Sequence, residues 1–267
     1  MLAAIDALEC FMRHEELGVS DVARRLGVAK STAHRLLTTL CARGIAAQDP
    51  ETGRYRLGMH LFELGQLASD RDPLRRAALP LLEELRQVSG KTVHLTVADG
   101  SDVVFVERLQ TLAGIRLMEG SGRRMPAHAT SAGKVLAAFD PMLAQARKDA
   151  GFPRLTPQTI STAAEFDRAL AEVRRAGFAH SVGESRPLLT SVAAPVRDAA
   201  GRARAAISVV GHSPDFGDQG RSARLVVTAA ARLHALSPLT FPPGPGPGGP
   251  ASKVRSPRSA SPRPWAR

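Results

Sequence analysis

The chain of 267 residues is long enough for two domains, and 43% of its residues are hydrophobic, so each domain can bury a core. Its 36 Lys and Arg outnumber 25 Asp and Glu, and the net charge of +11 favours an anionic partner: nucleic acid, a membrane surface or a small acidic ligand. The chain has only two cysteines, without the spacing of a zinc site, which excludes a disulfide-stapled or zinc-bound fold. It has no apolar run as long as a signal peptide or a membrane span, which excludes an exported or membrane-embedded protein. We therefore expect a cytoplasmic protein.

The N-terminal segment carries the most specific pattern in the chain. Apolar residues recur at the helical period over residues 2–12, which predicts one amphipathic helix. Ser20 is predicted to cap a second helix, Gly27 to interrupt it, and a third helix to run on to Gly44. The positions of the second and third helices that would face inward are apolar: Val22, Ala23, Leu26, Val28, Ala33, Leu36, Leu37 and Leu40. Residues 20–43 therefore have the pattern of a helix-turn-helix.

The outward face of the third helix is chemically suited to the major groove of DNA. Lys and Arg can donate to guanine edges there, while Ser and Thr reach base edges or phosphate oxygens. The predicted DNA contacts on this helix are Lys30, Ser31, Thr32, His34, Arg35 and Thr38. Ala29 precedes the helix without a capping side chain. The alternatives are that these charges are only solvated, or that the unit binds another protein.

Residues 45–57 have the pattern of a short hairpin, with a turn from Asp49 to Gly53. Its charged tip is expected to lie over the sugar-phosphate backbone, which makes the unit a winged helix-turn-helix. Arg54 and Arg56 of this wing, together with Ser20, complete the predicted set of DNA contacts. We expect Tyr55 to pack the wing against the helices.

The rest of the chain predicts an α+β domain after a linker helix. Predicted helices lie at residues 59–71, 73–88 and 221–236, and a Thr162/Glu165 capping box begins another that Gly177 ends. Strand signals lie at residues 92–98, 102–109, 115–118, 191–198 and 203–211. Strands flanked by helices on both sequence sides indicate the α+β class.

A helix that begins within residues 128–139 gives the strongest physical argument for an acidic ligand. The free N–H groups and the dipole at a helix start favour an anion such as a carboxylate. The alternative is that Thr130 and Ser131 simply cap a structural helix.

The last 27 residues, 241–267, contain 8 Pro, 4 Gly, five basic residues and no acidic ones. This composition cannot bury enough apolar surface to fold, so we expect a disordered basic tail. The tail is either a solvated extension or an arm that contacts DNA or a partner.

Several blocks, in this order, resemble the IclR family of bacterial transcriptional regulators: VARRLGVAKSTAHRLLTTL, DPETGRYRLG, HATSAGK, GFAHSVGE and SVAAPVRDAAGRARAAISVVG. The resemblance covers residues 2–237. It implies a winged helix-turn-helix over residues 1–58, a linker helix over 59–71 and an effector-binding domain related to the GAF and PAS folds over 72–240. It also implies a homodimer or homotetramer that binds a palindromic operator on double-stranded DNA and responds to a small organic or aromatic acid.

The same resemblance indicates which residues bind the effector. The family's pocket positions fall on Leu117, Met125, Ser131, Ala132, Ser181, Leu189, Ser191 and Ser208. Ser181 stands where the family often has an acidic residue, Leu188 where glycine is common, and Val210 where a second serine often sits. Because these departures reduce polarity and add bulk, we expect a ligand that is less polar than a small keto acid, or shaped differently.

An enzyme is the competing class of function. Gly133-Lys134 also occurs in phosphate-binding loops, but a Walker A motif needs glycine where His128 stands and Ser or Thr where Val135 stands. The sequence has no Gly-x-Ser-x-Gly elbow or metal-binding His pair, so no cofactor or metal is expected. His94, His128, His180 and His212 stand singly, and a lone histidine is more often a satisfied polar group than a catalyst.

A further alternative is a ligand-binding or protein-interaction module whose contact with DNA is secondary. Allosteric control of transcription remains the function that the sequence favours. In this interpretation two winged helices of an oligomer read two half-sites, and the effector changes their spacing or the balance between dimer and tetramer. The coupling free energy between the two sites is expected to be about 1–3 kcal/mol.

Overall fold

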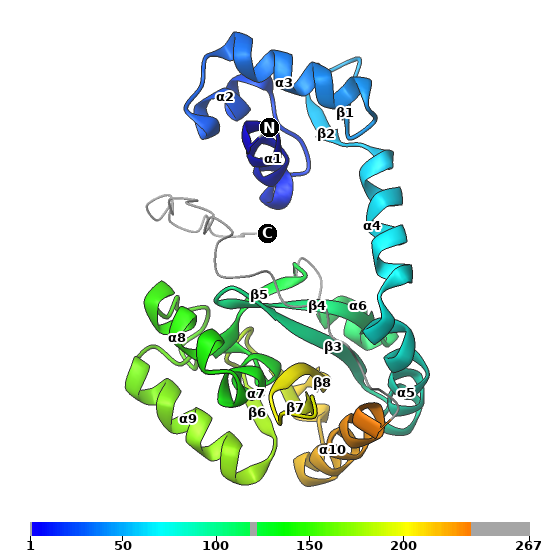
Figure 1. Cartoon of the computed structure of the whole chain (residues 1–267), viewed down its shortest axis with the longest axis vertical. Coiled ribbons are helices and arrows are strands. Elements are labelled where there is room, and N and C mark those ends of the chain that lie inside the picture. Colours follow the sequence, from blue (N-terminus) through cyan, green and yellow to red (C-terminus); the bar gives the residue numbers. More distant parts are fainter. Residues whose placement is uncertain (1, 118–121, 236–267) are drawn as a thin grey trace, which may run out of the picture. The chain divides into compact units, whose positions relative to one another are not determined.

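The computed structural model of the chain describes residues 2–117 and 122–235 (Figure 1). The chain divides into two compact units, Met1–Asp72 and Pro73–Arg267. The basic tail expected at residues 241–267 lies outside the described residues. No helix in the described part is long and apolar enough to cross a membrane.

The first unit is a bundle of helices followed by a two-stranded hairpin and a further helix. Its elements are α1 (Leu2–Glu9), a 3-10 turn (Cys10–Arg13), α2 (Val19–Leu26), α3 (Lys30–Ala42), β1 (Ala46–Gln48), β2 (Tyr55–Leu57) and α4 (Met59–Arg71). Its core contains Phe11 of the 3-10 turn, Val22 of α2, Leu37 of α3 and Tyr55 of β2. Gly27 ends α2 with a φ of +67°, a left-handed conformation that lets the chain turn tightly into α3.

The start of α2 differs from the prediction. Ser20 is not the cap, because the helix already begins at Val19 and the capping residue is Gly18. The Asp21 carboxylate reaches back and accepts a hydrogen bond from the Gly18 N–H at 3.3 Å. This bond satisfies the N–H of the capping residue, whereas Gly18 has no side chain to cap the first N–H groups of the helix. Ser20 lies exposed within the first turn.

The hairpin after α3 is held by its own turn and by the core. β1 and β2 pair antiparallel, and Oδ1 of Asp49 accepts hydrogen bonds from the N–H groups of Glu51 and Thr52 at 2.9 and 2.7 Å. The N–H and C=O groups of Tyr55 bond those of Leu17, both at 2.9 Å. The Tyr55 side chain is 2% exposed, so it packs the wing against the helices as expected.

The second unit is built on one antiparallel sheet of six strands in the order β5-β4-β3-β8-β7-β6. The strands are β3 (Thr92–Asp99), β4 (Asp102–Leu109), β5 (Arg124–Pro126), β6 (Ala179–Val182), β7 (Leu189–Arg197) and β8 (Ala203–His212). The helices are α5 (Pro73–Ser89), α6 (Leu112–Leu117), α7 (Ser131–Phe139), α8 (Pro141–Ala150), α9 (Ala163–Ala176) and α10 (Gln219–Ala235), with 3-10 turns at Ala127–Ala129 and Ser213–Asp215. This is the α+β class that the sequence predicts.

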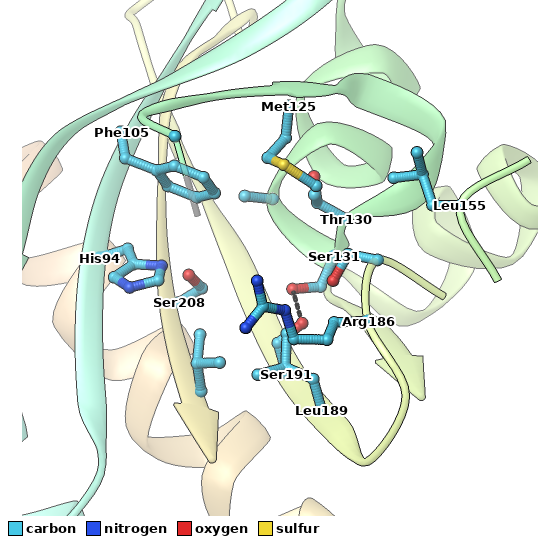
Figure 2. Close-up of a pocket in the computed structure, with 14 residues that line it drawn as sticks. His94, Phe105, Met125, Thr130, Ser131, Leu155, Arg186, Leu189, Ser191 and Ser208 are labelled. Carbon is cyan, nitrogen blue, oxygen red and sulfur yellow. Dashed lines mark hydrogen bonds between the residues drawn. The ribbon is translucent and has the colours of Figure 1, made fainter. Parts of the chain in front are cut away.

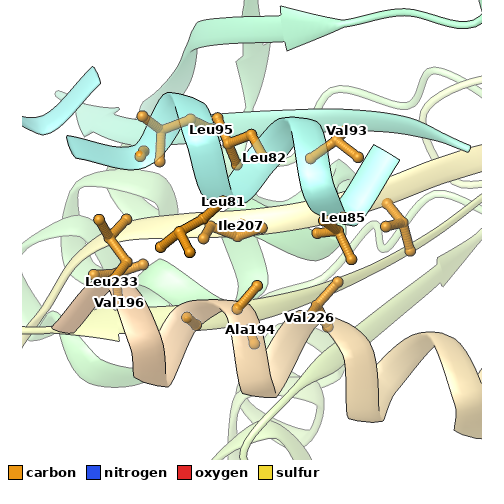
Figure 3. Packing of buried hydrophobic residues seen from close by; sticks show 14 of the residues in the cluster. Leu81, Leu82, Leu85, Val93, Leu95, Ala194, Val196, Ile207, Val226 and Leu233 are labelled. Atoms are coloured by element: carbon orange, nitrogen blue, oxygen red, sulfur yellow. The ribbon is translucent and has the colours of Figure 1, made fainter. Parts of the chain in front are cut away.

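One face of this sheet is covered by α5 and α10 (Figure 3). Leu82 and Leu85 of α5 pack there with Val226 of α10, and all three side chains are at most 4% exposed. The strands supply alternate residues to the same core, such as Leu95 of β3 and Ile207 of β8. Burial of these apolar side chains is the main stabilising term on this face.

The opposite face of the sheet is covered by α7, with α9 packed on α7. Val135 and Leu136 of α7 pack there with Phe166 and Leu170 of α9, and all four are fully buried. Ala206 of β8 belongs to this second core, although its neighbour Ile207 belongs to the first. Both faces of the sheet are therefore protected from water over much of their area.

The strand predicted at residues 115–118 is wrong, because residues 112–117 form the helix α6. The hydroxyl oxygen of Thr111 accepts a hydrogen bond from the Gly114 N–H at 3.1 Å, and the Thr111 carbonyl accepts one from the Ile115 N–H at 2.9 Å. These local bonds start a helical turn and outweigh the strand-like alternation of the side chains.

Other helix ends follow their local signals. The Thr162 hydroxyl accepts from the Glu165 N–H at 3.2 Å and the Glu165 carboxylate accepts from the Thr162 N–H at 3.2 Å, so the predicted capping box of α9 is present. Gly177 ends α9 with a φ of +80°. The helix α8, which the sequence did not predict, begins with Asp140 as its cap and Pro141 at its first position.

The start of α7 packs against the preceding 3-10 turn more closely than a side chain at Gly133 would allow. A Cβ atom built on Gly133 would lie 2.1 Å from the carbonyl oxygen of Ala127. Glycine at this position therefore fixes where the helix begins relative to the sheet.

We predict that Gly133→Ala lowers the free energy of unfolding of the second unit by about 1–3 kcal/mol or more, because the added methyl forces backbone atoms apart. Gly65→Ala in α4 is the matched control, since a Cβ there meets nothing within 4 Å and alanine favours a helix by up to about 1 kcal/mol. Differential scanning calorimetry resolves the two units. A Gly133→Ala variant as stable as the parent would contradict the packing constraint.

Candidate functional site

The third helix presents a polar face to solvent. Lys30, Ser31, His34, Arg35 and Thr38 are all exposed on α3. Thr32, which was also expected to face outward, is only partly exposed. The side chains of Lys30, His34 and Arg35 make no hydrogen bond or ion pair within the described residues, so their donors remain available to a partner.

The start of this helix has no side-chain cap. Ala29 occupies the capping position with extended backbone angles and offers no acceptor to the first N–H groups, as expected. Unsatisfied N–H groups at a helix start attract anions, and a DNA phosphate is one such anion.

Both predicted arginines of the wing are exposed. The guanidinium of Arg54 also donates to the backbone carbonyl of Glu16 at 3.1 Å, and its Nε lies 3.7 Å from the Glu16 carboxylate. Arg54 therefore ties the wing to the segment before α2. Arg56 is exposed on β2.

In the second unit, side chains alternate between the two faces of the sheet along each strand, so one set points away from the core under α5 and α10 and toward α7. Val93 and Leu95 of β3 lie in that core, so His94 between them points to the opposite face. In the same way Ser208 of β8 points away from the core that contains Ile207 and Val209. His94 and Ser208 are cross-strand partners in the ladder, which places them side by side on the α7 face.

These side chains line a cavity of about 310 Å³ between the sheet and the start of α7 (Figure 2). Six of the eight residues predicted to bind the effector line it: Met125, Ser131, Ala132, Leu189, Ser191 and Ser208. The cavity lies within the second unit, and its volume is at the lower end of the range for small-molecule sites.

The two other residues predicted to bind the effector, Ser181 and Leu117, do not line the cavity. Ser181 pairs with Ser191 across β6 and β7, but it lies one strand further out and is not part of the cavity wall. Leu117 ends α6 next to the undescribed residues 118–121 and is not among the lining residues.

The start of α7 forms one side of the cavity. The Thr130 hydroxyl caps this helix by accepting from the Gly133 N–H at 2.9 Å. Ser131 and Ser191 share a hydrogen bond of 2.8 Å between their hydroxyl oxygens, which joins the helix start to β7. Thr130 thus has the capping role that the sequence offered as one alternative, while the start of the same helix also faces a cavity.

The sequence reasoning considered two further lining residues without assigning them to the effector: Thr130 as a helix cap and Val210 as a departure from the family's pattern. It missed six others: His94, Phe105, Gly122, Leu155, Ser185 and Arg186. The sequence reasoning treated His94 as a lone histidine without a functional role. Its position between two apolar core residues of a strand was a signal that it points to the opposite face of the sheet, where it could line a site. Arg186 had no such signal, because it lies in the loop between β6 and β7.

His94 is a buried neutral group. Its side chain is 1% exposed and its ring lies 4.8 Å from that of Phe105, centroid to centroid. Burial, with the nearby charges of Arg108 and Arg123, lowers the pKa of His94 to about 3. Its Nε2 atom has no hydrogen-bond partner within the described residues, in contrast to the satisfied histidine expected.

The loop that carries Arg186 is fastened by buried polar contacts. The Lys134 ammonium of α7 lies 2.6 Å from the Glu184 carboxylate, and these side chains are 6% and 13% exposed. The Thr156 hydroxyl donates to the carbonyl oxygen of Gly183 at 2.6 Å. Lys134 therefore has a structural partner, and the described residues contain no cluster of His, Cys, Asp or Glu that could hold a metal.

A winged helix-turn-helix and a unit with a small-molecule cavity, joined in one chain, define the class of ligand-responsive DNA-binding regulators. The IclR helix-turn-helix domain matches residues 4–50, and the C-terminal domain of bacterial IclR transcriptional regulators matches residues 66–235. The chain belongs to the IclR family of transcriptional regulators.

Individual relatives agree with this assignment. The HTH-type transcriptional regulator BhcR of Paracoccus denitrificans is 34% identical over 240 residues, which cover 89% of this chain and 85% of the relative. An IclR transcriptional regulator from Alicyclobacillus acidocaldarius has a similar structure, with a TM-score of 0.76 and 28% identity over 88% of this chain and 96% of that one. An IclR homologue of Microbacterium hydrocarbonoxydans, solved in complex with 4-hydroxybenzoate, has a TM-score of 0.74 and 29% identity over 87% and 96% of the two chains.

We predict that Arg35→Ala weakens specific operator binding by about 1–3 kcal/mol, roughly 5- to 150-fold, because it removes a base-edge or phosphate donor from α3. Fluorescence anisotropy at fixed salt, with the DNA adjoining the protein's own gene, measures the change. Arg175→Ala, an exposed arginine of α9, is the control for the lost charge. Unchanged operator affinity in Arg35→Ala would contradict the assigned role.

The buried histidines predict sensitivity to acid. The pKa of His94 is lowered to about 3 and that of His128 to about 4, whereas an unfolded histidine has a pKa of about 6.5. The unfolded chain therefore binds protons first, and stability is lost as the pH falls below about 6.5. In His94→Leu the unfolding free energy should fall less steeply between pH 6 and 4, by up to about 1.4 kcal/mol per pH unit. Parallel urea-unfolding profiles for variant and parent would contradict this.

Proposed function

We propose that this protein represses or activates transcription by binding a palindromic operator as a homodimer or homotetramer, and that a small organic or aromatic acid in the cavity of the second unit changes its operator affinity. The observation that carries the proposal is the pairing of an unpartnered basic face on α3 with a cavity at the start of α7. The protein needs no cofactor for this function and acts in the cytoplasm, where the DNA is.

The exposed face of α3 supports sequence-specific binding to duplex DNA. Lys30 and Arg35 offer donors to bases or phosphates, while Ser31 and Thr38 offer hydroxyls. Arg56 of the wing is exposed on β2, the strand after the turn, which supports a contact with the DNA backbone. Ser20, Thr32, His34 and Arg54 belong to the same proposed set of DNA contacts, and Arg54 also ties the wing to Glu16.

The helix α4 supports oligomerisation. None of its 13 residues is buried, although it carries large apolar side chains. Met59, Phe62 and Leu67 are 70%, 62% and 47% exposed. Exposed apolar surface of this kind is normally covered by a partner, and a two-fold symmetric oligomer matches a palindromic operator.

The cavity supports an acidic effector that is larger and less polar than a short keto acid. Val210 stands in its wall beside Leu189, where a second serine would have made it more polar. The start of α7 favours an anion. The related protein from Microbacterium hydrocarbonoxydans was solved with an aromatic acid, 4-hydroxybenzoate. No described residue of the cavity wall is acidic, which also favours a negatively charged ligand.

An electrophoretic mobility shift on the DNA adjoining the protein's own gene, with salt and competitor controls, tests the operator. We expect specific retention by a species whose mass, from light scattering, is twice or four times that of the monomer. Sequence-independent retention, or none, would contradict the proposal.

Isothermal titration tests the effector. Aromatic acids should bind more tightly than glyoxylate or pyruvate, and a bound acid should change operator affinity by about 5- to 150-fold, which corresponds to 1–3 kcal/mol of coupling. Tight binding of glyoxylate or pyruvate would show that the cavity is suited to small polar acids, contrary to the proposal.

A further inference from the structure

The cavity has two polar groups that the family's effector positions do not account for. His94 of β3 lies in the wall beside Phe105, and Arg186 reaches in from the wall formed by the loop between β6 and β7 (Figure 2). In the same view Ser208 lies between His94 and the guanidinium group of Arg186, and the hydrogen-bonded Ser131 and Ser191 lie on the other side of that group.

We propose that His94 and Arg186 determine which acid the cavity accepts: Arg186 binds the carboxylate, and the imidazole of His94 binds a hydroxyl elsewhere on the same molecule. The ligand class is therefore a hydroxylated monocarboxylic acid with an apolar body. This inference rests on the proposed function, in which the cavity holds the effector.

Arg186 has the chemistry and the support to select a carboxylate. A guanidinium group donates two parallel hydrogen bonds to a carboxylate, which makes it more selective than a point charge. The backbone beside it is held by the ion pair of Glu184 with Lys134 and by the hydrogen bond from Thr156 to Gly183. The start of α7, at Ser131, supplies a second favourable environment for the same negative charge.

His94 has the chemistry to select a neutral hydroxyl. Its imidazole is buried and neutral, so it offers one hydrogen-bond donor and one acceptor, and its Nε2 has no partner within the described residues. A hydroxyl both donates and accepts, so it can pair with either tautomer. An ammonium group is disfavoured there, because burial and, to a smaller extent, the charges of Arg108 and Arg123 lower the pKa of His94 and oppose a positive charge at this place.

The remaining wall selects the body of the ligand. Its apolar lining side chains are Phe105, Met125, Leu155, Leu189 and Val210. A volume of about 310 Å³ has room for a ring that bears a carboxylate and a hydroxyl, whereas an acid of two or three carbons leaves more of the cavity empty.

The test uses the full-length protein and three probes: 4-hydroxybenzoate, benzoate, which lacks the hydroxyl, and phenol, which lacks the carboxylate. By isothermal titration we expect 4-hydroxybenzoate to bind the parent protein more tightly than benzoate by roughly 5- to 150-fold, because benzoate leaves His94 unpaired. Phenol should bind more weakly than 4-hydroxybenzoate by at least as much.

Two variants separate the two roles. In His94→Leu the two acids should bind with affinities within about twofold of each other, because the hydroxyl of 4-hydroxybenzoate no longer has an imidazole to pair with. In Arg186→Gln both acids should lose roughly tenfold or more, while phenol keeps its affinity. His180→Leu and Arg175→Gln, exposed residues outside the cavity, are the matched controls and should bind all three probes as the parent does.

The melting temperature of His94→Leu distinguishes a ligand-binding role of His94 from a structural one. Removal of an unpartnered buried polar group should leave the melting temperature of the unliganded protein at pH 7.5 unchanged or raise it, whereas loss of a structural contact would lower it. A lower melting temperature, persistent preference for the hydroxyl in His94→Leu, or equal loss of acids and phenol in Arg186→Gln would each overturn the inference.

Failure of all three probes to bind the parent protein would also overturn it. Specific operator binding by that protein without any probe distinguishes this failure from failure of the proposed function. If the operator is bound and another acid releases it, the proposed function stands and only the assignment of His94 and Arg186 falls.

Discussion

The second unit depends on a sheet that is covered by helices on both faces. Each strand must then supply side chains to both faces, and successive residues of a strand point to opposite faces. In β3, Val93 and Leu95 point into the core under α5 and α10, and His94 between them points to the other face. A shift of one residue in the register would put His94 into the dry core and an aliphatic side chain into the cavity. The polar lining of the cavity is thus a consequence of the same register that builds the core.

Local signals made much of the fold predictable from the sequence. Gly27 with its apolar flanks defined the helix-turn-helix, and the Thr162/Glu165 capping box defined the start of α9. The errors occurred where two local signals competed. Ser20 and Asp21 both suit a helix start, and the carboxylate of Asp21 decided it; the alternating pattern of residues 115–117 suits a strand, but the hydroxyl of Thr111 started a helix.

The residues of the cavity were predicted from the family resemblance, and this succeeded for residues on strands or at the start of α7. Ser131, Ser191 and Ser208 belong to such elements, and they line the cavity. Arg186 belongs to a loop whose course is set by contacts with residues far away in the sequence, such as the bond from Thr156 to Gly183, 27 residues apart. No periodicity records such contacts, so sequence reasoning could not place this arginine in the wall.

The Gly133-Lys134 pair, which also occurs in phosphate-binding loops, has a structural explanation at each position. Gly133 lets α7 approach Ala127, and Lys134 forms the buried ion pair with Glu184. A buried ion pair adds little net stability, because both charges lose their hydration, but its geometry is demanding. Here the pair joins α7, one turn after Ser131, to the loop of Arg186, so two walls of the cavity are linked by one interaction.

The size of the expected response fits the energetics of this cavity. A 5- to 150-fold change in operator affinity requires about 1–3 kcal/mol of coupling, and a single unsatisfied polar group in a protein interior costs about the same. His94 carries such a group in its Nε2 atom within the described structure. A ligand that forms a hydrogen bond with this group in one conformation of the protein and not in another can supply the whole coupling free energy. An apolar ligand that fills the cavity equally well in both conformations does not shift the equilibrium between them, however tightly it binds. In the proposed function, the polar groups rather than the apolar volume would therefore set how strongly a bound acid acts on the operator.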